Sequence, residues 1–269
     1  MLNISQNIAG KSQAAIVCSS LSKVYVTRDG TQIAALNSVD ISIAASELVT
    51  VVGPSGCGKS TLLKLLAGLI LRSAGTLVIG GKSVEGPRRD IGMVFQAATL
   101  LDWRTVLQNV MLPVDVLGLN RRSYRKRALE LLELVGLAGF EDKYPGELSG
   151  GMQQRVSLSR ALIHDPALLL MDEPFGALDA LTRETMNLEL QRVWMEASKT
   201  VVLITHSISE AVFLGDRVAV MTSRPGRLAE IVSVPLPRPR TLDMMASAEF
   251  GGIVNRIRGL LNTGGKLDS

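Results

Sequence analysis

The chain has 269 residues, 46% of them hydrophobic, and its 29 basic and 25 acidic residues give a net charge of +4. This length suits one large α/β domain or two subdomains that share a core. With only two cysteines and two histidines, we expect neither a disulfide framework nor a histidine-rich metal site. The mild positive charge fits a phosphate-binding protein or one near a membrane, and does not require a nucleic-acid partner.

The apolar runs of the chain are too short to cross a membrane. The longest, at 167–171 and 200–204, are the length of buried strands, whereas a spanning helix needs about 18 to 20 apolar residues. Residues 1–11 lack a cationic start followed by an apolar core, so we expect no signal peptide. We therefore predict a protein that stays in the cytoplasm and does not itself span the membrane.

The first part of the chain predicts an antiparallel β-region. Apolar and polar residues alternate in short stretches, and residues 28–31 carry an Asp-Gly turn signal. The expected antiparallel strands are 16–21, 23–26 and 33–36, and further strands are expected near 76–79 and 91–95.

A complete phosphate-binding pattern, G-x-x-x-x-G-K-[ST], lies between an apolar strand at 48–52 and a helix at 61–67. Its glycines allow backbone N–H groups to point at phosphate oxygens, and the helix N-terminus adds about half a positive charge. Lys59 can reach the β- and γ-phosphates, and the Ser60 hydroxyl can bind Mg²⁺. We predict nucleoside triphosphate binding here; the alternative is a flexible turn. The expected cradle comprises Gly53, Pro54, Ser55, Gly56, Cys57, Gly58, Lys59, Ser60 and Thr61.

Cys57 lies in this loop at a helix N-terminus and beside Lys59. Such an environment lowers a thiol pKa, so we expect Cys57 to be reactive.

From about residue 98 to 148 the pattern turns helical. Residues 123–135 place Ala128, Leu129, Leu132 and Val135 on one face, and Gly136 is typical of a helix stop. The basic run at residues 121–127 is either a solvated helix face or a contact for anionic lipid or nucleic acid.

Strand–helix alternation then returns, which predicts a parallel α/β core interrupted by the helical insert. The expected elements are a helix from 152, a strand at 167–171, a helix from about 180, a strand at 200–205, a helix after 207 and a strand at 217–222. Residues 235–240 have the proline-rich composition of a linker, and an amphipathic helix follows from Phe250 to Leu261.

Polar residues at strand ends supply candidate chemistry. Asp172 and Glu173 end a buried strand, where Asp172 could hold Mg²⁺ and Glu173 could polarise a water; an ordinary strand exit is the alternative. His206 ends a second strand and is a candidate γ-phosphate contact. Gln96 could contact Mg²⁺ or a water; alternatively, it is a polar residue at a hinge. Tyr25 could stack on a base; alternatively, it is an ordinary surface tyrosine.

Together these motifs closely resemble the nucleotide-binding subunit of ABC transporters over about residues 16–235. The phosphate loop, Gln96, the segment Leu148-Ser-Gly-Gly-Met-Gln-Gln-Arg155, Asp172-Glu173 and His206 occur in the order and spacing of that family. The segment at 148–155, hereafter the signature, is the most discriminating because other P-loop families lack it. Residues 101–110 and 221–227 resemble the nitrate/sulfonate/taurine branch of bacterial importers.

The resemblance implies an α/β fold: a P-loop NTPase core with a parallel sheet, an antiparallel β-subdomain and a helical insert. It implies an ATPase that uses ATP and Mg²⁺, with two copies arranged head to tail and each ATP between one phosphate loop and the partner's signature. The residues at 149–151, which open a helix, would meet the γ-phosphate from the other side. The site residues implied outside the phosphate loop are Tyr25, Gln96, Ser149, Gly150, Gly151, Asp172, Glu173, Asp179 and His206.

The resemblance also implies a membrane permease as partner, an extracytoplasmic solute-binding protein as indirect partner, no nucleic acid, and a peripheral location on the cytoplasmic face of the inner membrane. A small anion or a related solute such as nitrate, sulfonate or taurine is the expected cargo. The alternatives are a soluble ABC ATPase acting on ribosomes or DNA and a small-molecule P-loop kinase. Ser207 departs from the family, which often has Asp there.

We divide the chain into an N-terminal extension at 1–15, an ATPase domain at 16–235 with its insert at about 98–155, and a C-terminal linker and helix at 236–269.

Overall fold

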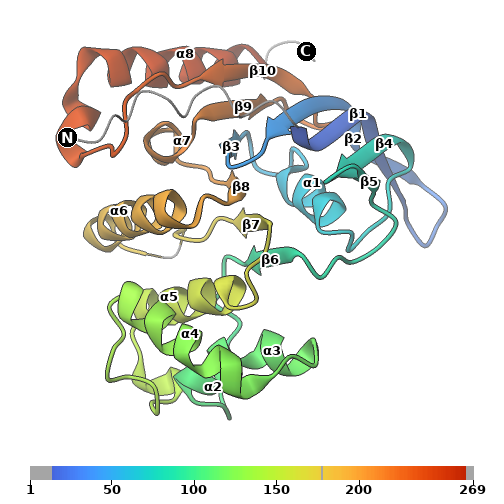
Figure 1. Cartoon of the computed structure of the whole chain (residues 1–269). Helices are drawn as coiled ribbons and strands as arrows, with labels where there is room; N and C mark the ends of the chain where they lie inside the picture. The colour runs from blue at the N-terminus through green and yellow to red at the C-terminus, as the bar shows by residue number, and fades with distance from the viewer. Residues whose placement is uncertain (1–13, 177, 265–269) are drawn as a thin grey trace.

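The computed structural model describes residues 14–264 except residue 177, and the extension predicted at 1–15 lies almost wholly outside this range. Two sheets, flanking helices and a helical insert make up the fold (Figure 1). The strands are β1 (Ala14–Val26), β2 (Gln32–Ala44), β3 (Leu48–Val52), β4 (Ala74–Ile79), β5 (Lys82–Ser83), β6 (Ile91–Val94), β7 (Leu168–Asp172), β8 (Thr200–Ile204), β9 (Arg217–Met221) and β10 (Leu228–Ser233). The helices are α1 (Lys59–Leu66), α2 (Val106–Val110), α3 (Leu112–Val116), α4 (Arg121–Leu134), α5 (Gly150–Leu162), α6 (Ala180–Ala197), α7 (Ile208–Leu214) and α8 (Ala248–Gly264), with short 3-10 turns at Pro145–Glu147 and Leu242–Ala246.

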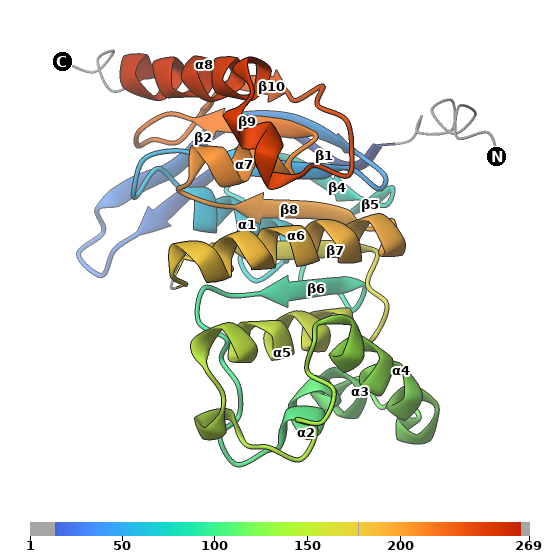
Figure 2. The same ribbon diagram turned by 90° about the vertical axis from the view of Figure 1, so that its left-hand side faces the viewer.

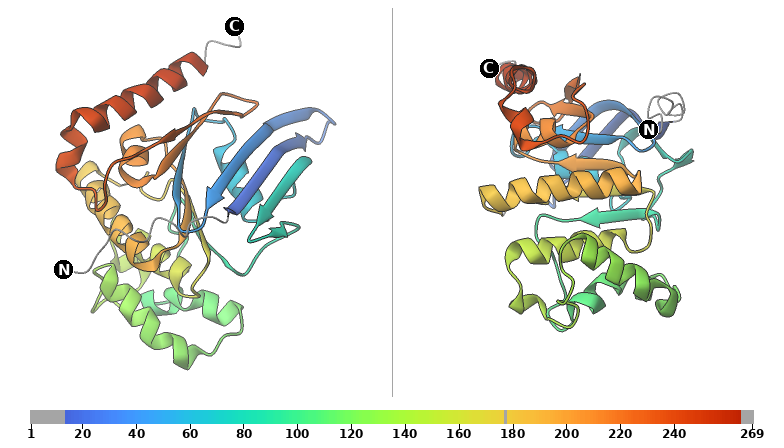
Figure 3. Two further views of the ribbon diagram at one scale, coloured as in Figure 1. Left: turned by 45° about the horizontal axis from the view of Figure 1, so that its top comes forward. Right: turned by 60° about the vertical axis from the view of Figure 1, so that its left-hand side comes forward.

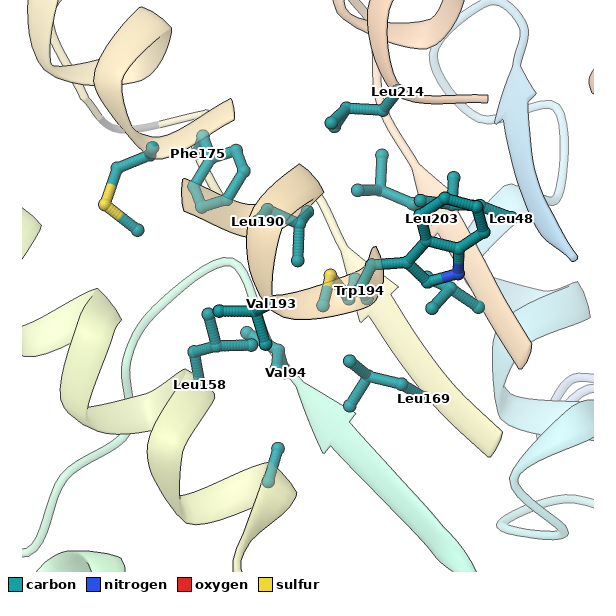
Figure 4. Packing of buried hydrophobic residues seen from close by; sticks show 14 of the residues in the cluster. Leu48, Val94, Leu158, Leu169, Phe175, Leu190, Val193, Trp194, Leu203 and Leu214 are labelled. Atoms are coloured by element: carbon teal, nitrogen blue, oxygen red, sulfur yellow. The ribbon is translucent and has the colours of Figure 1, made fainter. Parts of the chain in front are cut away.

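The larger sheet has the strand order β10-β9-β3-β8-β7-β6, and all its pairs are parallel except β9 with β10. Every residue of β3 and β8 is buried, as expected for parallel strands covered on both faces. Along β8, Val201 and Leu203 face one hydrophobic core, and Val202 and Ile204 face a second core. Figure 4 shows the first core, where Leu203 of β8 lies near Trp194 of α6 and Leu48 of β3.

The smaller sheet has the order β2-β1-β4-β5, and its strands pair antiparallel, as predicted. The two strands expected at 16–21 and 23–26 are one strand, β1. Its pairing with β2 shifts register near Leu21, next to Ser20 at φ +49°. This irregularity breaks the alternation of side chains that the sequence pattern relies on. The Asp-Gly turn is confirmed, with Gly30 at φ +83°.

The helical insert contains α2, α3 and α4 and lies beyond the β6 edge of the larger sheet (Figure 2). As predicted, α4 stops before Gly136, which has φ +70°. Ala128, Leu132 and Val135 are buried in the expected apolar face, and the side chain of Leu129 is half-buried. Helix α5 packs on α2, α4 and β6, and so joins the insert to the sheet.

The C-terminal part packs on the body of the chain. The predicted amphipathic helix is α8, which contacts α7, β9 and β10 and lies at the end of the molecule opposite the insert (Figure 3). The segment with linker composition is also anchored, because the Arg240 side chain is only 1% exposed. No helix within the described residues is both long and apolar enough to cross a bilayer.

Candidate ATP-binding site

The phosphate loop connects β3 to α1 in the conformation that its glycines permit. Gly56 has φ +75° and Gly58 has φ +102°. A Cβ built on Gly58 would lie 2.7 Å from the carbonyl oxygen of Ala35, so a larger residue does not fit. The Lys59 Nζ donates hydrogen bonds to the carbonyl oxygens of Gly53 (2.8 Å) and Pro54 (3.0 Å). The loop therefore holds its cation at the start of α1.

A cavity of about 300 Å³ opens over this loop. It brings together predicted residues from three separate regions of the chain: Tyr25 of β1, the phosphate loop, and Glu173 after β7. Two further residues, Ala35 and Arg224, were not identified from the sequence. The cavity lining is Tyr25, Ala35, Ser55, Gly56, Gly58, Lys59, Ser60, Thr61, Glu173 and Arg224.

Cys57 differs from the prediction. Its side chain is fully buried, and a Cβ built on Gly53 would lie 2.7 Å from its Sγ. Burial raises the pKa of the Cys57 thiol, although the nearby Lys59 opposes this shift. The predicted low pKa and reactivity are therefore wrong, because the thiol points into the protein beneath the loop and not toward the cavity.

Two carboxylates at the end of β7, those of Asp172 and Glu173, have different surroundings. The Ser60 hydroxyl donates a hydrogen bond to Asp172 Oδ1 at 3.3 Å. Burial, with a smaller contribution from the neighbouring Glu173, raises the pKa of Asp172. Glu173 has φ +47°, an uncommon conformation for a non-glycine residue, and its N–H donates to the carbonyl oxygen of Ile204 at 2.9 Å. Its Oε2 lies 3.2 Å from His206 Nδ1, so these two predicted site residues are in contact.

Gln96 lies close to these groups. It follows β6, and the Gln154 side chain of α5 donates to the adjacent Phe95 carbonyl oxygen at 3.0 Å. A Cβ built on Gly176 would lie 3.7 Å from Gln96 Nε2 and 3.6 Å from Glu173 Oε2. The Gln96 and Glu173 side chains therefore approach the same point of the backbone.

The signature lies outside the cavity of its own chain. Ser149 is the N-cap of α5, and its Oγ accepts a hydrogen bond from the Met152 N–H at 3.3 Å. Ser149 and Gly150 are exposed, and Gly151 is half-buried. Asp179, the exposed N-cap of α6, accepts from the Thr182 N–H at 3.0 Å, and these hydrogen bonds lower its pKa. Ser149, Gly150, Gly151 and Asp179 therefore do not line the cavity of their own chain.

The residues around Ser60 fit a magnesium ion. Its hydroxyl and the Asp172 carboxylate are hard oxygen ligands held within hydrogen-bonding distance of each other. No group of three or more His, Cys, Asp or Glu side chains suited to a metal occurs within residues 14–264, leaving aside residue 177. Such a sparse protein set is typical of Mg²⁺ that keeps several waters and binds substrate phosphates.

Comparison with known proteins identifies the family. The family model for ABC transporters matches residues 36–176. The chain is 48% identical to an uncharacterised ABC transporter ATP-binding protein, MJ0412, of Methanocaldococcus jannaschii, over 82% of this chain and 83% of that protein. It is 46% identical to the taurine import ATP-binding protein TauB of Rhizobium johnstonii, over 89% and 93% of the two chains. The nitrate import ATP-binding protein NrtC of Synechococcus elongatus is 44% identical over 87% of this chain and 36% of its own length.

Solved structures of ABC cassettes are similar to this chain in fold. The dimeric ATP-binding cassette MJ0796, in a post-hydrolysis state bound to ADP and Pi, has a TM-score of 0.72 and 33% identity to this chain. The match covers 82% of this chain and all of that one. The predicted fold class and the resemblance to the nitrate- and taurine-type branch are confirmed. The chain therefore belongs to the ABC transporter family, as an ATP-hydrolysing cassette.

Proposed function

We propose that two copies of this chain bind ATP head to tail and hydrolyse it in sites shared between them. One observation carries the proposal: the cavity gathers the phosphate loop and Glu173, whereas Ser149 and Gly150 are exposed elsewhere on the chain. An exposed helix N-terminus with free N–H groups is suited to an anion. A second copy could bring its signature to the open side of the cavity, and the dimeric cassette MJ0796 offers a precedent.

Within that shared site, each group has a distinct role. The loop amides and Lys59 bind the phosphates, and Ser149 to Gly151 of the second copy contact the γ-phosphate. Glu173 polarises the attacking water, and His206, at 3.2 Å, orients that carboxylate and contacts the γ-phosphate. Tyr25, 37% exposed at the cavity, stacks on adenine. Asp179 contacts the other copy.

The proposed magnesium ligands are Ser60, Asp172 and Gln96. Ser60 and Asp172 would hold the ion beside the phosphates, where its charge stabilises the negative charge of the transferring group. Gln96 stands between the nucleotide and the insert, because the segment preceding it is hydrogen-bonded to Gln154 of the signature helix. Movement of α5 toward a second copy would therefore also reach Gln96.

We further propose that the ATPase powers solute import through a separate membrane permease, from the cytoplasmic face of the inner membrane. A groove of about 410 Å³ between β6 and α3, hereafter the β6–α3 groove, supports this. Phe95 and Val116 line it and are 39% and 75% exposed. Exposed apolar side chains in a groove typically mark a protein-interaction site. The groove adjoins Gln96, so a helix seated there could sense the nucleotide.

The names of two relatives indicate which class of solute the transporter would import. TauB and NrtC are named for taurine and nitrate import, so we propose a small anion or a related solute such as nitrate, sulfonate or taurine. An extracytoplasmic solute-binding protein would deliver it to the permease. A soluble ATPase acting on ribosomes or DNA, the alternative, finds no support in these relatives.

The shared site is tested by Ser149→Arg, which places a bulky cation where the second copy must approach. We expect ATP hydrolysis to fall to background, while calorimetry shows unchanged ATP binding to the single chain. Asn120→Arg is the matched control, because Asn120 is also the N-cap of a helix and accepts a hydrogen bond from the Arg122 N–H. Loss of ATP binding in Ser149→Arg would place the signature within its own chain's site and contradict the shared arrangement.

The permease proposal is tested by Val116→Asp in the β6–α3 groove. Co-purification with a polytopic membrane protein should weaken, because a charged carboxylate then replaces an exposed apolar side chain and must lose its water when a partner helix covers it. Met195→Asp, at a 42% exposed apolar position on α6, is the control and should co-purify like wild type. Equal recovery of the membrane protein with Val116→Asp and wild type would reject the groove as the docking site.

A further inference from the structure

The turn between β9 and β10 packs against the phosphate loop. The Gly226 N–H donates to the Ala35 carbonyl oxygen at 3.0 Å, and the Asn37 N–H donates to the Gly226 carbonyl oxygen at 2.9 Å. A Cβ built on Gly226 would overlap the carbonyl oxygen of Cys57. The Thr222 N–H closes the turn on the Arg227 carbonyl oxygen at 3.0 Å. Backbone contacts therefore fix residues 222–227 at the rim of the ATP cavity.

From this turn, Arg224 lines the cavity. Its guanidinium makes no hydrogen bond or ion pair with the residues that the structure describes, and it is exposed. Arg227, directly before β10 and in the same turn, is exposed too but does not line the cavity. Of the two arginines in this turn, Arg224 therefore lies at the nucleotide site and Arg227 does not.

The position of the turn indicates which part of the nucleotide Arg224 meets. Its partners Ala35 and Asn37 belong to β2, and Tyr25 pairs with Ile33 of the same strand. Arg224 therefore enters from the side of β2, as Tyr25 does. Lys59 and Ser60, in contrast, stand at the start of α1, beside Asp172.

We propose that Arg224 is a nucleotide-binding residue that contacts the part common to ATP and ADP: the base, the ribose or the inner phosphates. The inference rests on the proposed ATP site. A guanidinium suits this position because it can stack on an aromatic face and donate several hydrogen bonds to phosphate or ribose oxygens. A lysine would keep the charge but lose the planar fork and its stacking.

The proposed contact between Arg224 and the nucleotide has a consequence for the kinetics of ATP hydrolysis. Because Arg224 meets the common part, it binds the ground state and the transition state alike, and its loss raises KM for ATP without lowering kcat. A residue acting on the γ-phosphate would instead lower kcat.

Isothermal titration calorimetry of the full chain with MgATP and with MgADP tests the assignment. Arg224→Ala should weaken the binding of both nucleotides by about tenfold, as expected for losing a hydrogen bond to a charged group. Arg224→Lys should recover part of that loss, and Arg227→Ala should bind both like wild type. Thermal unfolding without nucleotide should be the same for all four proteins.

Wild-type affinity of Arg224→Ala for both nucleotides would overturn the inference, and so would a loss confined to ATP. In either case the wild-type chain still binds ATP, and the proposed ATP site stands. If wild type binds neither nucleotide, the proposed site fails, and the role of Arg224 fails with it.

Discussion

Burial governs the chemistry of the two cysteines more strongly than neighbouring charge. Cys57 stands at a helix N-terminus beside Lys59, yet its pKa is raised because its thiol is removed from water. Cys18 is 3% exposed, and burial, with a smaller contribution from Asp40, raises its pKa to about 12. The sequence reveals the positive neighbour of Cys57, whereas the direction in which the thiol points depends on Gly53 and on the packing of the loop.

At neutral pH we expect Cys57 to resist thiol reagents in the folded chain. The thiolate is the reactive form, and a raised pKa together with full burial removes both the nucleophile and its access. Mass spectrometry after treatment with a maleimide at pH 7.5 should find Cys57 unmodified until denaturant is added. Rapid, stoichiometric labelling of the folded chain would contradict this.

The raised pKa of Cys18 makes folding less favourable in alkali. The folded Cys18 thiol keeps its proton up to about pH 12, whereas the unfolded thiol ionises near its ordinary pKa of 9.0. Below pH 9 the stabilisation is therefore fully present, and it is lost as pH rises toward 12. Between pH 8 and 10 the free energy of unfolding should fall by about 1 kcal/mol more in wild type than in Cys18→Ala. Urea titrations at both pH values measure this difference. An equal change in the free energy of unfolding between pH 8 and 10 for the two proteins would refute the prediction.

Among the elements, the C-terminal segment is held by a buried arginine. The Arg240 guanidinium donates to the carbonyl oxygens of Val212, Phe213 and Gly215 at the end of α7, and to those of Val234 and Leu236 in its own segment. Burial, with the nearby Arg238, lowers its pKa to about 10. Carbonyl oxygens at a helix C-terminus carry partial negative charge, so α7 stabilises this cation.

Arg240→Ala should therefore destabilise the chain by about 2–4 kcal/mol, because buried carbonyl groups lose their donors. Arg256→Ala is the control, since Arg256 forms an exposed ion pair with Glu230 and should cost less than about 1 kcal/mol. Urea unfolding followed by circular dichroism gives both values. Similar small losses in the two variants would show that Arg240 does not anchor the segment.

The sequence predicted the elements that are defined by local pattern. The buried strands β3, β7 and β8 follow from apolar runs, and the end of α4 follows from Gly136. It missed what depends on contacts between distant segments. The proline-rich composition of residues 235–240 indicated a linker, but the segment is anchored because three carbonyl partners of Arg240 lie 25 to 28 residues earlier in the chain. Arg224 was missed because its turn reaches the cavity through pairing with β2, about 190 residues before it.

At the scale of the whole molecule, a single chain contains every group of the proposed shared site, but its signature does not line its own ATP cavity. Glu173, His206 and the phosphate loop meet within one copy, whereas the exposed signature has no counterpart there. In the proposed arrangement, ATP would be both the substrate and the link between the two subunits. Association should then depend on bound ATP and end when it is hydrolysed.

Glu173→Gln tests this claim most directly, because it keeps the size and hydrogen bonding of the side chain but removes the base. Lys59, Ser60 and the loop amides still bind ATP, so hydrolysis alone should fall, by roughly 10²–10⁴. With MgATP, gel filtration of Glu173→Gln should show a species of twice the monomer mass, wild type should not accumulate it, and adding Ser149→Arg should abolish it. A Glu173→Gln variant that hydrolyses ATP at the wild-type rate, or that binds ATP and stays monomeric, would contradict the shared site.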